Sequence, residues 1–309
     1  KGKNVIFLTG VDEHGQKIQR TAESKEIAPN IHCDEITSKY KHLWSKLNIS
    51  YDRFVRTTSE EHLDLVKEFY ERVKASDDIY MGRQNGWYCV GCEEYKEIDN
   101  KDKTPSCGIH KKDLEWRDEE NLFFKLSKYQ GHIEKLINTE GFIKPESRKK
   151  EIINFVAKGL RDFSISRVNL EWGINVPDNK KHTFYVWFDA LLGYISGSLY
   201  DQKNPELTNK SLTNWPASIH IIGKDILRFH AVYWPAMLIS AKIKPPEKVF
   251  GHGFLTREGQ KMGKSLGNVL DPIDLLNYSG IDAMRWYLLR DIEFGEDGDF
   301  QIRRFVDIV

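Results

Sequence analysis

Residues 218–238 read SIHIIGKDILRFHAVYWPAML. An apolar strand runs into a sharp turn that carries Asp225, and the turn leads directly into an apolar pattern with helical spacing. The same order occurs in NVIFLTGVDEHG (4–15) and in TFYVWFDALLGYISG (183–197), and KVFGHGFL (248–255) supplies a further strand. Buried strands that lead into helices are typical of parallel sheets. We therefore expect an α/β fold built on a Rossmann-like, doubly wound parallel sheet.

An aspartate follows the strand in each of the three strand–helix units. Ligands of doubly wound sheets bind beyond the carboxyl ends of the strands, and Asp12, Asp189 and Asp225 are all expected at that edge. Aspartate is also a common helix N-cap, which explains any one of them without a ligand. All three together favour a binding site for a polar ligand.

The composition excludes several classes of protein. The chain has 309 residues, of which 40% are hydrophobic, so it is long enough for two or three packed domains and is not a disordered polymer. Its 46 basic and 46 acidic residues cancel, so nucleic acid would have to bind through local patches and not through net charge. No apolar run approaches about 20 residues, so no membrane span is expected.

Changes of pattern divide the chain into parts. We expect the first part of the Rossmann-like domain at 1–67, an insertion at 68–181, the second part of that domain at 182–250, a lysine-loop region at 251–298 and the start of a helical domain at 299–309. Helices are expected in RKKEIINFVAKGLRDF (148–163), DPIDLLNYSG (271–280) and IDAMRWYLLRDIEF (281–294), and DIEFGEDGDF (291–300) is interpreted as a solvated connector. Because the first strand is already under way with no preceding Met, we expect a fragment of a longer chain.

Three of the four cysteines lie in one cluster within the insertion. The pattern is Cys89-Val-Gly-Cys92 followed by Cys107-Gly-Ile-His110, which is CxxC and CxxH with a short loop between them. Two such knuckles bring four ligands to a tetrahedral zinc ion and leave no position open for water, so we expect a structural zinc site. The alternative is reduced thiols in a loop. The pattern does not fit a secreted disulfide framework, which favours a reducing compartment.

Apolar and aromatic residues at two strand–helix junctions share faces. Trp187, Ala190 and Tyr194 are spaced i, i+3 and i+7, and Ile226 and His230 are spaced i and i+4. Any amphipathic helix shows such spacing, so ordinary core packing is the favoured explanation from spacing alone, and a binding pocket is the alternative.

A lysine-rich loop follows the last strand. In TREGQKMGKS (256–265), Lys261 and Lys264 lie three residues apart among glycines, a composition typical of phosphate binding. The Walker P-loop is excluded because only three residues separate Gly259 from Gly263. A phosphate-binding loop and a solvated basic loop remain as alternatives.

Five of these segments together resemble the methionyl-tRNA synthetases, a family of class I aminoacyl-tRNA synthetases. In that family's order they are FLTGVDEHGQKIQ (7–19), GLRDFSISR (159–167), FYVWFDALLGY (184–194), HIIGKDILRFHAVYWPAML (220–238) and GHGFLTREGQKMGKS (251–265). The resemblance covers essentially the whole chain, and the cysteine cluster falls in the family's connective insertion. It implies a methionine–tRNA ligase, which uses ATP to convert L-methionine to methionyl-adenylate and pyrophosphate and then transfers the methionyl group to the 3′ end of tRNA(Met).

The resemblance also implies roles for individual residues. Asp12 is similar to the carboxylate that holds the substrate ammonium group, and Arg167 to the residue that orients it. The methionine pocket would consist of Trp187, Ala190, Leu191, Tyr194, Ile226 and His230, and the ATP site of Gly223, Asp225, His252, Gly253, Phe254, Lys261 and Lys264. Lys261 and Lys264 occupy the lysines of the family's KMSKS loop and would be catalytic because they stabilise the leaving pyrophosphate, with Mg²⁺ on the phosphates.

The chain departs from the family pattern in two ways. The family's HIGH segment precedes the first strand and is not in this sequence, and Gly263 stands where KMSKS has serine, which adds backbone freedom to the loop. Because the HIGH segment is not in this sequence, we expect the chain alone to be inactive. Most of the helical anticodon-binding domain is also not in this sequence, so we expect the chain alone to read tRNA identity poorly.

Two alternatives to methionine activation stay open. One is another class I synthetase, such as one for cysteine or leucine, against which Trp187, Tyr194 and His230 argue. The other is a non-catalytic tRNA-binding relative, against which Asp12 and the two loop lysines argue. We expect a monomer in the cytoplasm, or in a mitochondrion or plastid if a transit segment precedes the chain.

Overall fold

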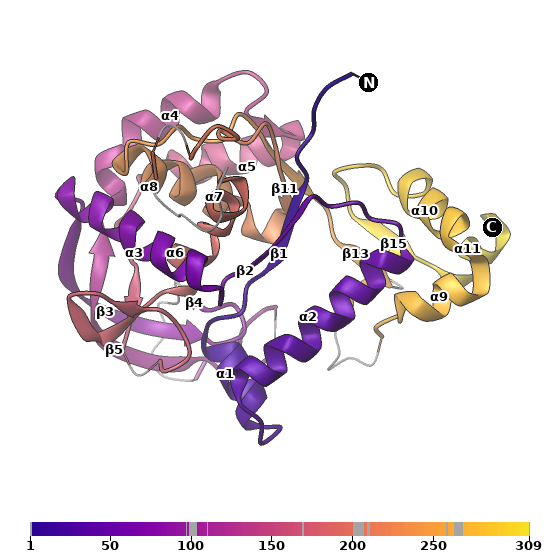
Figure 1. The fold of residues 1–309 in the computed structure, drawn as a ribbon, viewed down its shortest axis with the longest axis horizontal. Coiled ribbons are helices and arrows are strands. Elements are labelled where there is room, and N and C mark those ends of the chain that lie inside the picture. Colours follow the sequence, from indigo (N-terminus) through magenta and orange to yellow (C-terminus); the bar gives the residue numbers. More distant parts are fainter. Residues whose placement is uncertain are drawn as a thin grey trace.

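A computed structural model gives the fold (Figure 1) and describes residues 2–96, 98, 104–109, 111–168, 170–199, 207–208, 211–257, 259–262 and 268–308. Within these ranges, none of the helices combines the length and the apolar character that crossing a membrane requires.

Parallel strands form the predicted Rossmann-like part. β1 (Leu8–Val11) pairs in parallel with β2 (Arg53–Arg56), and the chain crosses between them through α1 (Gln16–Glu23) and α2 (Pro29–Lys46). β11 (His220–Gly223) pairs in parallel with β12 (Val249–His252) after a crossover through η2 (Lys224–Ile226), η3 (Phe229–Tyr233) and α8 (Trp234–Ser240). These strand–helix–strand crossovers confirm the predicted α/β class.

The third predicted strand–helix unit differs from the other two. β10 (Asn179–Phe184) precedes α6 (Val186–Ala190) and α7 (Gly193–Ser198) as expected, but it pairs antiparallel with β8 (Ser166–Arg167) and β9 (Asn175–Val176). Only Pro177 and Asp178 separate β9 from β10, and so short a connection allows only antiparallel neighbours. The prediction that this strand belongs to the parallel sheet is therefore wrong.

A second lobe is built on a long antiparallel hairpin. β3 (Ile79–Cys89) pairs with β5 (Glu115–Phe124) along their whole length, with β4 (Glu94–Lys96) and β7 (Phe163–Ser164) on the outer edges. The helical elements of this part are α3 (Glu60–Ala75), η1 (Leu126–Tyr129), α4 (Gln130–Asn138) and α5 (Glu146–Val156). Gly159, with φ +86°, lies just beyond α5, so the helix predicted at 148–163 ends earlier.

The predicted boundaries at 67/68 and 181/182 stay a prediction, although two features bear on them. α3 runs across 67/68, and Ser59 caps its first turn by accepting a hydrogen bond from the backbone N–H of His62 at 3.4 Å. β6 (Ile143–Lys144), which lies within the predicted insertion, pairs in parallel with β12. The insertion is thus interwoven with the parallel sheet.

One hydrophobic core joins the parallel strands to the helices of the insertion. Phe69 of α3 lies 5.9 Å from the ring of Phe188 in α6 and 6.1 Å from that of Trp234 in α8. Ile133 of α4 and Ile152 of α5 belong to the same cluster and are fully buried. Each side chain of this size contributes about 1.5–3 kcal/mol when it leaves water.

The C-terminal elements gather on one side of the molecule (Figure 1). They are β13 (Leu255–Arg257), β14 (Gln260–Lys261), α9 (Pro272–Ser279), α10 (Ile281–Arg290), β15 (Gly298–Phe300) and α11 (Ile302–Ile308), and they include both helices predicted after residue 270. The acidic stretch 291–300 is not a solvated connector. Asp297 accepts hydrogen bonds from Lys224 Nζ at 2.6 Å and from the backbone N–H of Phe254 at 2.8 Å, and Phe294 stacks on Phe250.

Candidate active site

A cavity of about 170 Å³ lies at the carboxyl end of β1. A cavity of about 150 Å³ accommodates benzene, so a compact apolar group fits here. It brings together Asp12 and all six residues expected in the apolar pocket, with five others: the lining consists of Gly10, Val11, Asp12, Val55, Thr57, Trp187, Ala190, Leu191, Gly193, Tyr194, Ile226 and His230.

The polar groups of this cavity form an uncharged chain. The backbone carbonyl of Ile226 can only accept, so His230 donates to it from Nδ1 at 2.9 Å, and its Nε2 accepts from the Tyr194 hydroxyl at 2.7 Å. Burial lowers the pKa of His230 to about 4 and raises that of Tyr194 above its usual value. Both groups are therefore neutral at physiological pH, which suits an uncharged side chain.

Stacked aromatic rings form the cavity wall. Trp187 lies parallel to Phe229 with ring centroids 4.1 Å apart, and Tyr194 lies 4.1 Å from the ring of His220. Trp187 lines the cavity, and sulfur makes favourable contacts with aromatic rings. A thioether is thus well matched to this wall.

Among the described residues that line the cavity, Asp12 is the one carboxylate. Although it is exposed to the cavity, the protein packed around it raises the pKa of its carboxyl to about 6, chiefly through burial and then through the charge of Asp189. Water in the cavity weakens this effect. A cation placed next to Asp12 would favour the ionised carboxylate, so the cavity suits a molecule with a positive group and an apolar tail.

Asp189 lies behind the cavity wall and is only 2% exposed. It accepts hydrogen bonds from His14 Nδ1 and from His62 Nε2, each at 2.7 Å. The expectation that it faces the ligand edge is therefore wrong. The sequence did not single out either histidine, although His14 follows Asp12 by two residues in the same turn.

The residues expected to bind ATP meet at one edge of the parallel sheet. Gly223 ends β11, His252 ends β12, and the two are register partners. Asp225 follows in η2. The Nζ of Lys224 lies over the ring of Phe254, 4.6 Å from the ring centroid. A Cβ atom on Gly253 would collide with the backbone of Glu296, so glycine is required there.

The lysine loop follows β12 in the chain and begins at this edge of the sheet. Lys261 lies in β14, where its backbone pairs with Thr256 of β13. Asp299 holds the base of this hairpin because it accepts hydrogen bonds from the Gly259 N–H at 2.8 Å and from Thr256 Oγ1 at 2.9 Å. Lys264 and Gly263 lie outside the described residues.

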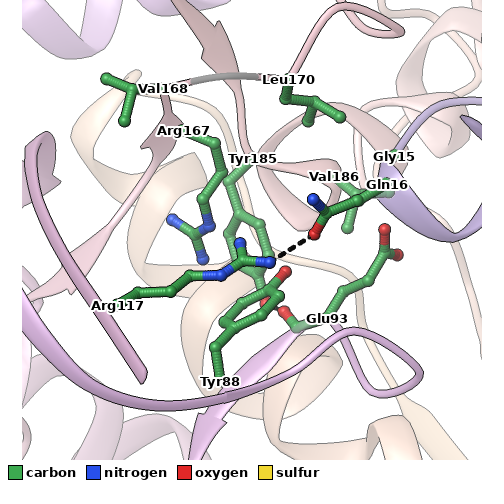
Figure 2. Close-up of a pocket in the computed structure, with 10 residues that line it drawn as sticks. All are labelled: Gly15, Gln16, Tyr88, Glu93, Arg117, Arg167, Val168, Leu170, Tyr185 and Val186. Atoms are coloured by element: carbon green, nitrogen blue, oxygen red, sulfur yellow. Dashed lines mark hydrogen bonds between the residues drawn. The ribbon is translucent and has the colours of Figure 1, made fainter. Parts of the chain in front are cut away.

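Arg167 lines a separate, smaller cavity of about 10 Å³ (Figure 2), enough for about one water molecule. It is 4% exposed, donates to Ser164 Oγ at 2.6 Å, and lies 4.0 Å from the ring centroid of Tyr185. Arg117 stacks over Tyr88 at 3.8 Å in the same place. The structure therefore places Arg167 next to the strand that leads into the cavity wall, and its role toward a substrate stays a prediction.

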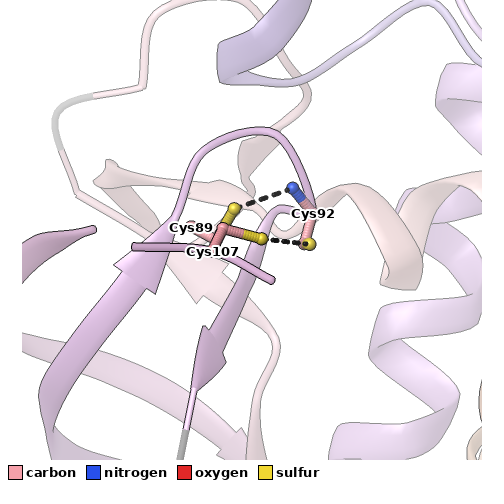
Figure 3. A group of neighbouring side chains, drawn as sticks. All are labelled: Cys89, Cys92 and Cys107. Atoms are coloured by element: carbon pink, nitrogen blue, oxygen red, sulfur yellow. Dashed lines mark hydrogen bonds between the residues drawn. The ribbon is translucent and has the colours of Figure 1, made fainter. Parts of the chain in front are cut away.

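Cys89, Cys92 and Cys107 form a candidate metal site (Figure 3), with their sulfur atoms all within 4.8 Å of one another. Cys92 Sγ lies 3.7 Å from Cys107 Sγ, close to the separation of about 3.8 Å that a tetrahedral ion with bonds of about 2.3 Å imposes. Burial and the neighbouring thiols raise the pKa of Cys92 to about 12, so a metal ion would be needed to hold it as thiolate. The donors fit a metal ion; His110 lies outside the described residues.

A Rossmann-like sheet with an amino-acid-sized cavity beyond the end of β1 is the architecture of a class I aminoacyl-tRNA synthetase, and a family model shows that the chain belongs to this class. The model of the family described as tRNA synthetases class I (M) matches residues 1–100 and 96–309, and the chain belongs to this family.

Relatives of the chain within this class are named for methionine. The chain is 57% identical to the methionine–tRNA ligase of Synechocystis over 100% of its own length and 58% of the relative's, and 52% identical to the chloroplastic/mitochondrial methionine–tRNA ligase of Arabidopsis thaliana over 100% and 50%. The Mycobacterium tuberculosis methionyl-tRNA synthetase in complex with methionyl-adenylate superimposes with a TM-score of 0.92 at 39% identity, over 99% of this chain and 60% of that one. The chain thus spans between half and three fifths of the length of these relatives.

Proposed function

We propose that the full-length protein is a methionine–tRNA ligase. The observation that carries this proposal is the cavity in which a neutral Tyr194–His230 pair and the ring of Trp187 accompany a single carboxylate, Asp12. The carboxylate matches the ammonium group of methionine, and the aromatic, uncharged lining matches its thioether side chain. The relatives with the same fold are methionine–tRNA ligases.

The carboxylate of Asp12 and the apolar and aromatic lining residues each bind a different part of methionine. The ammonium group binds Asp12, and the thioether lies against Trp187, Tyr194 and the apolar residues Ala190, Leu191 and Ile226. Apolar pockets discriminate by about 1–3 kcal/mol per methylene, so cysteine is rejected because it leaves much of the cavity unfilled. Arg167 packs against Tyr185, which directly follows β10, and acts as a positioning residue for the part of the cavity wall that begins at Trp187.

Activation joins methionine to ATP. A carboxylate oxygen of methionine attacks the α-phosphorus, the bond to the β-phosphate oxygen breaks, and pyrophosphate leaves with the bond electrons. No base is needed, because the attacking carboxylate is already ionised. ATP binds at Gly223, Asp225, His252, Gly253 and Phe254. Lys261 and Lys264 stabilise the charge that develops on the leaving group.

Mg²⁺ bound with ATP supplies further neutralisation of the phosphates. In the second step the 3′-terminal hydroxyl of tRNA(Met) attacks the acyl carbon and AMP leaves. The cysteine cluster, with His110, holds one structural Zn²⁺ that stabilises the insertion and takes no part in the chemistry.

We propose L-methionine, ATP and tRNA(Met) as the partners, because the relatives are named methionine–tRNA ligases. The expectation of a monomer stays a prediction. The protein acts in the cytoplasm or in an organelle, since the relatives include a bacterial ligase and one named chloroplastic/mitochondrial.

Amino-acid-dependent exchange between ATP and labelled pyrophosphate tests the proposal on the full-length protein. We expect exchange with methionine and not with leucine or cysteine; exchange with leucine or cysteine alone would overturn it. Lys264→Ala should lower kcat by about 10²–10³-fold and leave methionine binding unchanged, because it removes one charge-stabilising donor. Lys248→Ala, an exposed lysine of another loop, is the matched control and should change neither.

A further inference from the structure

Three chain segments meet at one buried carboxylate behind the cavity. His14 follows β1, His62 lies in the first turn of α3, and Asp189 lies in α6. Each oxygen of Asp189 accepts one imidazole N–H, and the far nitrogen of His62 lies 3.0 Å from Ser196 Oγ. His62 and Asp189 are 0% and 2% exposed, so this His14–Asp189–His62 network is shielded from solvent.

The network contains an ionised carboxylate. Burial alone would raise the pKa of Asp189, but the hydrogen bonds from His14 and His62 outweigh it, and the pKa lies below its usual value. An ionised group in such a place persists only when it is paired and fully hydrogen-bonded. Both oxygens of Asp189 accept an imidazole N–H, so hydrogen bonds compensate for its burial.

Each segment that meets at Asp189 also supplies part of the cavity wall. Asp12 precedes His14 by two residues, Thr57 precedes α3, and Ala190 and Leu191 follow Asp189 directly. The network thus ties together parts of the wall that are distant in sequence.

One serine connects the network to the cavity. Ser196 Oγ lies within hydrogen-bond distance of His62 Nδ1 and, at 3.2 Å, of the carbonyl of Gly193, which lines the cavity. Ser196 therefore links the His14–Asp189–His62 network to the cavity wall.

We propose that Asp189, held between His14 and His62, is a positioning residue that sets both the shape of the cavity wall and the charge on Asp12. The inference rests on the proposed function, because it takes the ammonium group of methionine as the ligand of Asp12. Asp189 opposes ionisation of Asp12 through its own negative charge, and the two histidines favour it.

Several other charged or titratable groups face Asp12, and the test must take them into account. They are Glu13 and His14 on its own segment, His62 on α3, Asp189 on α6, Tyr194 on α7 and His230 on η3. Glu13 is already paired with Arg56 at 2.9 Å, and the Tyr194–His230 pair is neutral. The groups left to tune Asp12 are those of the network.

The test is the pH dependence of methionine affinity, measured by calorimetry on the full-length protein from about pH 5 to about pH 8. In the wild type we expect affinity to fall on the acid side as Asp12 takes up a proton. Asp189→Asn removes a negative neighbour, so the midpoint of this fall should move to lower pH. His62→Gln and His14→Gln keep an N–H donor for Asp189 but remove the imidazoles that lower the pKa of Asp12, so the midpoint should move to higher pH.

The opposite signs separate an electrostatic role from structural damage, because a variant that only loosens the wall weakens binding at every pH without moving the midpoint. Asp78→Asn is the matched control: Asp78 is a fully buried carboxylate that accepts from Lys128, Tyr129 and Ser240, and its variant should leave the midpoint unchanged. Unchanged midpoints in all three network variants would overturn the inference. A wild type that does not bind methionine would instead contradict the proposed function.

Discussion

Removal of the Tyr194 hydroxyl probes the chain of hydrogen bonds from Ile226 through His230 to Tyr194. In Tyr194→Phe, His230 keeps its bond to the Ile226 carbonyl, but its Nε2 loses the donor that lies 2.7 Å away. Nε2 cannot take up a proton instead, because burial has lowered the pKa of His230 to about 4. In the free protein, water in the cavity can donate to Nε2.

Methionine binding expels that water, so the loss should appear in affinity more than in stability. A buried acceptor without a partner costs about 1–3 kcal/mol. At about 1.36 kcal/mol per factor of ten, Tyr194→Phe should weaken methionine binding by about 5- to 150-fold. We expect the free energy of unfolding without ligand to change by less than about 1 kcal/mol.

Calorimetric titration with methionine measures this effect, and a double-mutant cycle with His230→Asn identifies its source. The two residues should be coupled by about 1–3 kcal/mol in methionine affinity, because either substitution breaks the same bond. Tyr70→Phe is the matched control, since it removes a hydroxyl that donates to Asp178 at 2.9 Å, away from the cavity lining, and should leave affinity unchanged. Additivity of the cycle to within about 0.5 kcal/mol would refute the reasoning.

Three other predictions concern the Lys224–Asp297 hydrogen bond near the lysine loop, zinc binding and the pH dependence of stability. Asp297→Asn weakens this bond and should lower kcat for pyrophosphate exchange about tenfold, with methionine affinity unchanged. A change in methionine affinity alone would argue against a role of the bond in catalysis. Cys92→Ser should remove bound zinc, as measured by metal analysis under reducing conditions, and lower the melting temperature; a wild type without zinc would contradict the site. The pKa of Asp12 is raised from 3.8 to about 6 in the folded protein, so the ligand-free protein should lose stability as the pH rises through that interval. Asp12→Asn should abolish this loss, which denaturation measured across the same pH range would show. Equal pH slopes for the variant and the wild type would count against the raised pKa.

The parts of the site that the sequence predicts are those that depend on local spacing. Trp187 and Ala190 lie one turn apart in α6, Tyr194 follows in α7, and the structure puts all three on the cavity. Gly223 and His252 meet because each ends a strand of one parallel pair. Spacing alone favoured ordinary core packing for the first set, and the resemblance to the methionyl-tRNA synthetases assigned both sets to a binding site.

The parts that the sequence did not predict depend on contacts between distant segments. His14 and Asp189 are 175 residues apart, and no local pattern indicates that one imidazole donates to that carboxylate. The acidic stretch at 291–300 has the composition of a solvated surface, yet Asp297 is paired with Lys224 from the end of β11. The direction of β10 was misjudged because an apolar run before a helix occurs in antiparallel hairpins as well.

The most direct test of methionine activation is to mix the full-length protein with ATP and an equimolar set of methionine, leucine and cysteine, and to identify the enzyme-bound adenylate by mass spectrometry. The account predicts methionyl-adenylate, in an amount that Tyr194→Phe reduces at limiting methionine. An adenylate of leucine or cysteine without that of methionine would contradict it.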